Sequence, residues 1–415
     1  MAQVGWIDLS KSQRDKIVAV LDLLRPEGRI DELGTGVVRD ALADRLFPGI
    51  STIHTRAKYF YIIPNILRQY ASLSDAQKAK RPLGQFLEQK EKEIMWRLAE
   101  EYNHEENHGV IGITKKRGES LARYPSTIYW RALATFNFIR FRNYSLGAYQ
   151  NHFSRPVSQN DLGFQPAGDD DPSDDKANTY RNNMGIFAPY DPAYETSITL
   201  DLDASQAQDL SDRILRYAKD SLLAELIRNE LLYTLFFDIQ YHGRQAFMVF
   251  APLAISHIEN RELRRHVTMG HDFSLAMYGA NITYNQLIQQ HFQDRDPFAA
   301  EWRSWVERMA HGFLAPDELT IDFVSYLAPT MRDSTYDFLD KWFTLIKGGN
   351  LDVPERFELV ENQEYNNKRN KARLRHKQFD DCKKDAWIGF DYLDYRYNNA
   401  KTILNDITQG LHVTP

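Results

Sequence analysis

The segment after Pro48 and Gly49 carries the residue types with which proteins contact DNA. Hydroxyl, imidazole, guanidinium and ammonium side chains follow one another over residues 51–58, and residues 32–47 before them have the apolar spacing of a helix. In a helix-turn-helix, the second helix presents its N-terminal residues to the major groove, while the first helix crosses the phosphate backbone. Arginine and lysine contact guanine edges, and hydroxyls or helix N-terminal amides hold phosphate oxygens. We therefore expect a helix-turn-helix whose DNA-facing residues are Arg39, Arg45, Ser51, Thr52, His54, Arg56 and Lys58.

Two packed helices that leave a polar face in water explain the same block. In that case Asp40 and Asp44 pair with Arg39 and Arg45, or with neighbouring helices, and no external partner is required. The sequence leaves both interpretations open.

A short repeat has the same ambiguity. The segments STIHTRA (51–57) and STIYWRA (126–132) share Ser, Thr, Ile, Arg and Ala at matching positions. The match indicates either a duplicated helix-turn-helix unit or a coincidence, because the flanking sequences do not align well.

A basic loop follows a short apolar segment. Residues 110–113 have the pattern of a strand, and Lys115, Lys116 and Arg117 come after it, where a winged-helix protein would extend a basic wing. Arg131 lies further along, in a helix-prone segment, and is a fourth candidate for DNA contact. Aromatic residues between these cations either stack on bases or pack in the core, which is the usual place for an aromatic stripe at helical spacing. These aromatic residues are Tyr124, Tyr129, Trp130 and Phe138.

The densest positive run of the chain lies near its C-terminal end, over residues 368–377. Counterion release favours placing such a run on phosphates. A solvated helix, or docking on an acidic partner, explains it equally well. The candidate DNA-binding residues in this run are Lys368, Arg369, Lys371, Arg373 and Arg375.

The formal net charge of −6 hides a polarised chain. Residues 1–160 hold 24 Lys and Arg against 17 Asp and Glu, whereas residues 161–350 hold 16 against 29, and residues 351–415 hold 11 of each. Such asymmetry is typical of a polyanion-binding face, and equally of two solvated surfaces. We expect the basic N-terminal part to face DNA and the acidic, helical part to dock other protein subunits.

Motifs for enzymatic chemistry are weak. The HEENH motif (104–108) spaces two histidines for one helical face, but Gly109 would end that helix at once, and no third ligand is evident. Phosphate-binding glycine loops and a nucleophile elbow are missing from the sequence, and Cys382 stands in a charged context. We therefore expect no cofactor, no metal site and no catalytic residues. The alternatives are a metal-dependent nuclease whose carboxylates assemble only in the fold, and a scaffold that contacts only protein.

Helical periodicity dominates the chain and predicts a mainly α fold, with a helix-turn-helix or winged-helix-like N-terminal region followed by a larger helical domain. Helices are expected over residues 10–24, 82–103 and 398–411, and residues 205–241 are strongly helical in period. Another helix is expected from Ser51 or Thr52, which Pro64 would kink or end. We expect no membrane span and no export signal, and the single cysteine suits the reducing cytoplasm. The expected regions are 1–80 (helix-turn-helix-like), 81–160 (helical or winged-helix-like), 161–200 (acidic loop or linker) and 201–415 (helical C-terminal domain).

The opening GWIDLS, the block from RIDELGTG to YFYIIP, YPSTIYW and the closing DYLDYRYNNAKTILNDI together resemble an uncharacterised bacterial family. Its members begin with a Gly-Trp-Ile-Asp-Phe-Ser-like motif and continue with a Phe-Pro-Gly-Thr-Ser-Thr-like turn; Leu9 and Ile50 depart mildly from that pattern. The resemblance implies a place beside helicase-like and phospholipase-D-like proteins in phage-defence regions, and it supplies no catalytic residues. Combined with the charge pattern, it leads us to expect a non-enzymatic DNA-binding or adaptor subunit.

Overall fold

The computed structural model describes residues 31–154, 184–191, 194, 198–239, 245–292, 296–349, 351 and 353–412. The helix expected over 10–24 and the GWIDLS motif lie outside the described residues, as does most of the acidic linker expected over 161–200. The described part is helical and contains no strand; a lone antiparallel bridge joins Ile139 to Ile186. The mainly α fold is confirmed. The strand expected at 110–113 is wrong, because these residues form a turn, and the winged-helix form of the N-terminal region is not confirmed.

The chain divides into two compact units, each built from separate stretches of sequence. Unit 1 comprises Met1–Leu42 and Thr268–Leu393, and unit 2 comprises Ala43–Val267 and Asp394–Pro415. Two helices contribute residues to both units, namely α2 (Gly36–Leu46) and α13 (Arg261–Gln289).

Unit 2 holds most of the described helices, and its longest is α5, whose bounds match the helical pattern expected over 82–103. The region of helical period over 205–241 forms three helices, because Ser221 and Asn229 each accept a backbone N–H and start a new helix. The elements of unit 2 are α3 (Tyr59–Ala71), α4 (Asp75–Lys80), α5 (Leu83–Glu101), η1 (Glu106–His108), α6 (Pro125–Thr135), α7 (Leu146–Ser154), α9 (Ala204–Tyr217), α10 (Leu222–Arg228), α11 (Glu230–Asp238), α12 (Ala246–Ala254), η4 (Ile255–His257) and α19 (Tyr397–His412).

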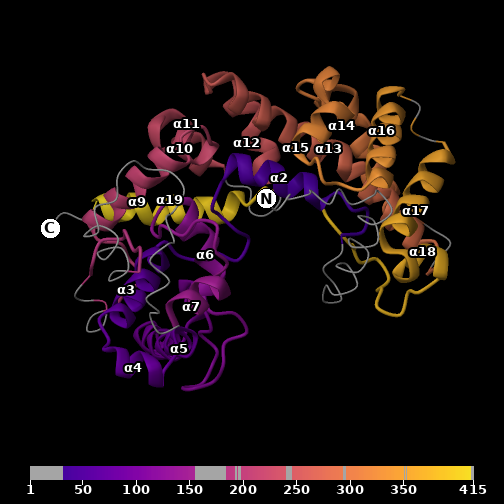
Figure 1. Cartoon of the computed structure of the whole chain (residues 1–415). Coiled ribbons are helices and arrows are strands. Elements are labelled where there is room, and N and C mark those ends of the chain that lie inside the picture. The colour runs from indigo at the N-terminus through magenta and orange to yellow at the C-terminus, as the bar shows by residue number, and fades with distance from the viewer. Residues whose placement is uncertain are drawn as a thin grey trace, which may run out of the picture. The chain divides into compact units, whose positions relative to one another are not determined.

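Helix α3 is the apolar centre of the first half of unit 2. Its side chains from Tyr59 to Leu67 are buried, and it packs on both α5 and α6. The helix continues through Pro64 to Ala71, so this proline does not end it. In the other half of the unit, α19 lies along α9 (Figure 1), which brings the C-terminal helix beside a segment almost 200 residues earlier.

Unit 1 is organised around two buried tryptophans that are fixed to α13. Nε1 of Trp305 donates to the carbonyl oxygen of Leu275 at 2.8 Å, and Nε1 of Trp342 donates to that of Ala276 at 2.9 Å. A Cβ atom at Gly279 would lie 2.1 Å from the Trp305 ring, so only glycine permits this close approach. The elements of unit 1 are α14 (Ala299–Gly312), η5 (Pro316–Glu318), α15 (Ile321–Leu327), α16 (Asp333–Lys347), α17 (Glu355–Lys368), η6 (Arg369–Lys371) and α18 (Arg373–His376).

Candidate nucleic-acid interface

The segment expected to be a recognition helix is a turn. Residues 51–58 are not helical, and α3 begins only at Tyr59. The hydroxyl of Tyr129 accepts the backbone N–H groups of Thr55 and Arg56 at 2.9 and 3.1 Å, and a carboxylate oxygen of Asp406 accepts that of Ala57 at 2.7 Å. Because partners from α6 and α19 bind these donors, the segment need not become helical to satisfy them. The expected helix from Ser51 or Thr52 is therefore wrong.

The two copies of the short repeat have different structures. The first copy is this turn, whereas the second lies within α6. His54 from the first copy stacks on Tyr129 from the second, with ring centroids 4.1 Å apart and the planes inclined by 5°. Burial lowers the pKa of His54 to about 4, so its imidazole is neutral at pH 7. The repeated segments therefore pack on each other rather than forming two equivalent helix-turn-helix units.

Arg56 and Lys58 are used inside unit 2. Nε of Arg56 donates to both carboxylate oxygens of Asp406 at 2.9 and 3.0 Å, and its Nη2 reaches Asp201 at 2.9 Å. The buried ammonium of Lys58 donates to Oε1 of Gln206 at 2.8 Å. Neither side chain has the solvent exposure that a groove contact requires. Ser51 Oγ is also buried, without a hydrogen-bond partner in the described part of the chain, and Thr52 is exposed.

The three remaining arginines of the N-terminal block and α6 have acidic neighbours. Arg39 donates to Asp40 at 2.8 Å and lies over the ring of Phe390. Arg45 lies 3.7 Å from Glu262, whereas Arg131 is 84% exposed and lies 3.5 Å from Asp44. Of this group, only Arg131 presents most of its side chain to solvent.

The basic run over 368–377 splits into internal and surface residues of unit 1. Lys368 and Arg373 both bind the carboxylate of Glu32, and Arg373 also binds Asp381. Arg369 and Arg375 lie over the ring of Tyr365 and are exposed, as is Lys371. Lys368 and Arg373 therefore hold the segment before α2 in place. Their charges are used inside unit 1, so less of the positive charge of the run remains for a partner.

The basic loop between α5 and α6 keeps its charges at the surface. Lys115, Lys116 and Arg117 are exposed, and their charged groups form no hydrogen bond or ion pair with a described residue. The backbone N–H of Lys116 donates to Oε2 of Glu119 at 3.2 Å. The loop base is packed, because a Cβ atom at Gly112 would lie 2.3 Å from the side chain of Leu121. The structure thus combines an anchored base with an uncompensated cationic tip.

A buried carboxyl group joins the helices on either side of this loop. Glu91 of α5 accepts the backbone N–H of Ser126 at 2.5 Å and its hydroxyl at 3.0 Å, at the start of α6. Burial raises the pKa of Glu91 to about 8, so this carboxyl group is mostly protonated at pH 7. The contact ties the start of α6 to the middle of α5.

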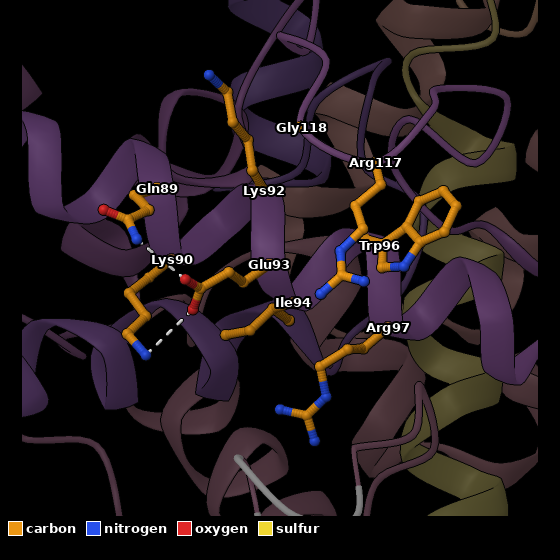
Figure 2. A pocket seen from close by; sticks show the side chains of 9 residues that line it. All are labelled: Gln89, Lys90, Lys92, Glu93, Ile94, Trp96, Arg97, Arg117 and Gly118. Carbon is orange, nitrogen blue, oxygen red and sulfur yellow. Dashed lines mark hydrogen bonds and ion pairs between the residues drawn. The ribbon is translucent and has the colours of Figure 1, made fainter.

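A cavity of about 470 Å³ lies between α5 and the basic loop. Arg97 and Arg117 line it, and neither forms an ion pair with a described residue. Glu93 brings the one carboxylate of the lining, and it is bound by Lys90 at 3.2 Å and by Gln89 at 3.1 Å. Figure 2 shows the side chains that line the cavity, which are Gln89, Lys90, Lys92, Glu93, Ile94, Trp96, Arg97, Arg117 and Gly118.

Sequence reasoning found Arg117 but missed the α5 side of this cavity. Lys90, Glu93 and Arg97 are spaced by three and four residues, so a helix places them on one face. This spacing was a usable signal once the helix over 82–103 was expected. The convergence of that face with the loop depends on the turn at 102–105, where Asn103 and His104 have positive φ angles.

Other candidate sites receive less support from the structure. His104 lies in a turn and His108 in η1, so the two histidines of HEENH do not share one α-helical face. Among the described residues, no group of three or more His, Cys, Asp or Glu side chains is arranged to hold a metal ion. None of the described helices combines the length and the apolar character needed to cross a membrane.

Comparison with known proteins places the chain in a family. The model of DUF6361, a family of unknown function, matches residues 1–410. The chain belongs to this family. No curated protein and no solved structure matches it. Membership confirms the resemblance to an uncharacterised family, and it assigns no role to any residue of this chain.

Proposed function

We propose that this protein is a non-enzymatic DNA-binding or adaptor subunit of a multi-protein bacterial system, for which the family resemblance suggests antiphage defence. The single observation that carries the proposal is the uncompensated basic surface formed by Lys115, Lys116 and Arg117 next to Arg97. In most other parts of the described chain, the candidate cations have carboxylate or carbonyl partners within their own unit. A phosphate backbone supplies the missing counter-charge, and counterion release makes such binding favourable at moderate salt.

This proposal moves the DNA contact away from the turn at 51–58. Arg56 and Lys58 are internal, so the contact surface is the basic loop with the cationic face of α5. Arg131 is a further candidate because it is mostly exposed. The exposed Arg369, Lys371 and Arg375 of unit 1 form a separate candidate surface.

The test compares two triple charge reversals by fluorescence anisotropy with a labelled DNA of mixed sequence. The first variant, Lys115→Glu/Lys116→Glu/Arg117→Glu, removes the basic loop. The matched control, Arg369→Glu/Lys371→Glu/Arg375→Glu, makes the same formal charge change in unit 1. We expect the loop variant to lose roughly 10- to 100-fold in affinity and its salt slope to fall by about 2 to 3, since each phosphate contact contributes about 0.9.

Two results would overturn the proposal. An unchanged, salt-insensitive affinity in the loop variant removes its basis. An equal loss in the control shows that binding follows the total charge and not this surface. Unfolding curves of both variants establish that any loss of binding is not a loss of fold.

A further inference from the structure

The cavity beside the basic loop has the lining of a site for an anionic ligand that also carries a ring. Arg97 and Arg117 come from different elements, and Figure 2 shows the Arg117 side chain extending from the loop toward residues of α5. The only carboxylate of the lining, Glu93, is already neutralised by Lys90. An anion that enters therefore meets two arginines without ion-pair partners in the described chain.

Trp96 makes this cavity different from an ordinary basic surface. It is the only aromatic residue of the lining, and its other neighbour is the His104 ring, with centroids 5.2 Å apart. Its Nε1 is buried and has no hydrogen-bond acceptor in the described part of the chain. Buried indole N–H groups normally have a partner, so an oxygen acceptor of a bound ligand that reaches this nitrogen would satisfy it.

The volume of the cavity favours a single-stranded over a double-stranded nucleic acid. A volume of about 470 Å³ lies in the range of small-ligand sites and accommodates one nucleotide. A base in a duplex is stacked on both sides and cannot enter such a space, whereas an unpaired base can stack on an aromatic ring.

We infer that this cavity holds one unpaired nucleotide of a single-stranded nucleic acid, with its base against Trp96 and its phosphate between Arg97 and Arg117. The inference rests on the proposed function, since Lys115 and Lys116 would hold the neighbouring phosphates. It adds a preference for single strands that the charge of the loop alone does not supply.

The experiment measures the affinities of the full chain for a labelled oligothymidylate and for a duplex of equal length. Four proteins are compared: wild type, Trp96→Leu, Trp96→Phe and Arg97→Ala. We expect wild type to prefer the single strand, and Trp96→Leu to lose roughly 5- to 100-fold for the single strand with little change for the duplex. Trp96→Phe, which keeps a ring, should retain most of the affinity. Arg97→Ala removes one of the two phosphate-binding arginines and keeps Trp96. It should also lower the affinity for the single strand.

The outcomes separate this inference from the proposed function. Single-strand affinity that Trp96→Leu and Arg97→Ala both leave unchanged, while the triple loop variant loses binding, overturns the inference and leaves the proposed function intact. No binding of either nucleic acid by wild type overturns both. Calorimetry with thymidine monophosphate distinguishes a strand from a free nucleotide: tight binding of the mononucleotide together with weak binding of the oligomer overturns the assignment to a strand.

Discussion

The turn at 51–58 and the basic loop at 113–118 belong to the same unit and contain the same kinds of cation, yet the fold treats them in opposite ways. In the turn, Arg56 is 15% exposed and bound to Asp406, and Lys58 is buried. In the loop, Lys115 and Lys116 are exposed, and their ammonium groups form no ion pair or hydrogen bond with a described residue.

The difference lies in what packs on each segment. The turn is covered by α6 and α19, and α19 brings the carboxylate of Asp406. The loop is packed at its base, where Gly112 lies against Leu121, whereas Lys115, Lys116 and Arg117 are exposed. A basic segment becomes structural when another element carries an acid to it, and it stays available for an external anion when none does.

The largest expected effect comes from breaking the ion pair of the turn. Arg56→Met leaves the carboxylate of Asp406 buried without its cation, which costs about 3–5 kcal/mol of unfolding free energy. Urea denaturation at pH 7 measures the change. A loss below about 1 kcal/mol would show that Arg56 is no more structural than the loop cations.

Acid should weaken the turn through His54. Its pKa is about 4 in the fold and near 6.5 in the unfolded chain, so the unfolded state binds more protons between these values. Stability should therefore fall by about 3 kcal/mol as the pH drops from about 6.5 to 4. Because burial also lowers the pKa of His266 to about 4, the quantity to measure is the difference between wild type and His54→Gln over this range. Parallel pH profiles for the two proteins would contradict the prediction.

Two glycines sharpen the contrast between the base and the tip of the loop. Both Gly112 and Gly118 have positive φ angles, but a Cβ atom meets Leu121 at the first position and open space at the second. We expect Gly112→Ala to cost about 2 kcal/mol or more, from backbone strain and overpacking, and Gly118→Ala about 1 kcal/mol, from strain alone. Thermal unfolding of the pair provides the comparison, and the reverse order would mean that the base is not anchored as described.

The smallest effect belongs to the loop tip. Lys116→Ala removes an exposed side chain without a described partner, so the unfolding free energy should stay within about 0.5 kcal/mol of wild type. The same denaturation measurement serves as the matched control for Arg56→Met. A loss of unfolding free energy above about 1 kcal/mol would show that the Lys116 side chain stabilises the fold and is not simply exposed at a binding surface.

Local patterns determined most of the helices. The stretch over 82–103 became α5, and 398–411 became α19, because apolar spacing and flanking breakers act over a few residues and are readable in sequence. The same reasoning failed at 51–58, where Tyr129 and Asp406 take the backbone donors that a helix would have used. It also failed at 110–113, where a turn with Gly112 at positive φ replaces the expected strand.

The sequence by itself determined that this chain is helical, belongs to an uncharacterised family and carries several basic clusters. Only the tertiary structure decided which cluster stays available. Arg56 and Asp406 are 350 residues apart in the chain, and Lys368 meets Glu32 across a separation of 336. Charge pairing acts over a few ångströms in space, whereas sequence patterns report neighbours along the chain, so the number of cations was readable from the sequence and their partners were not.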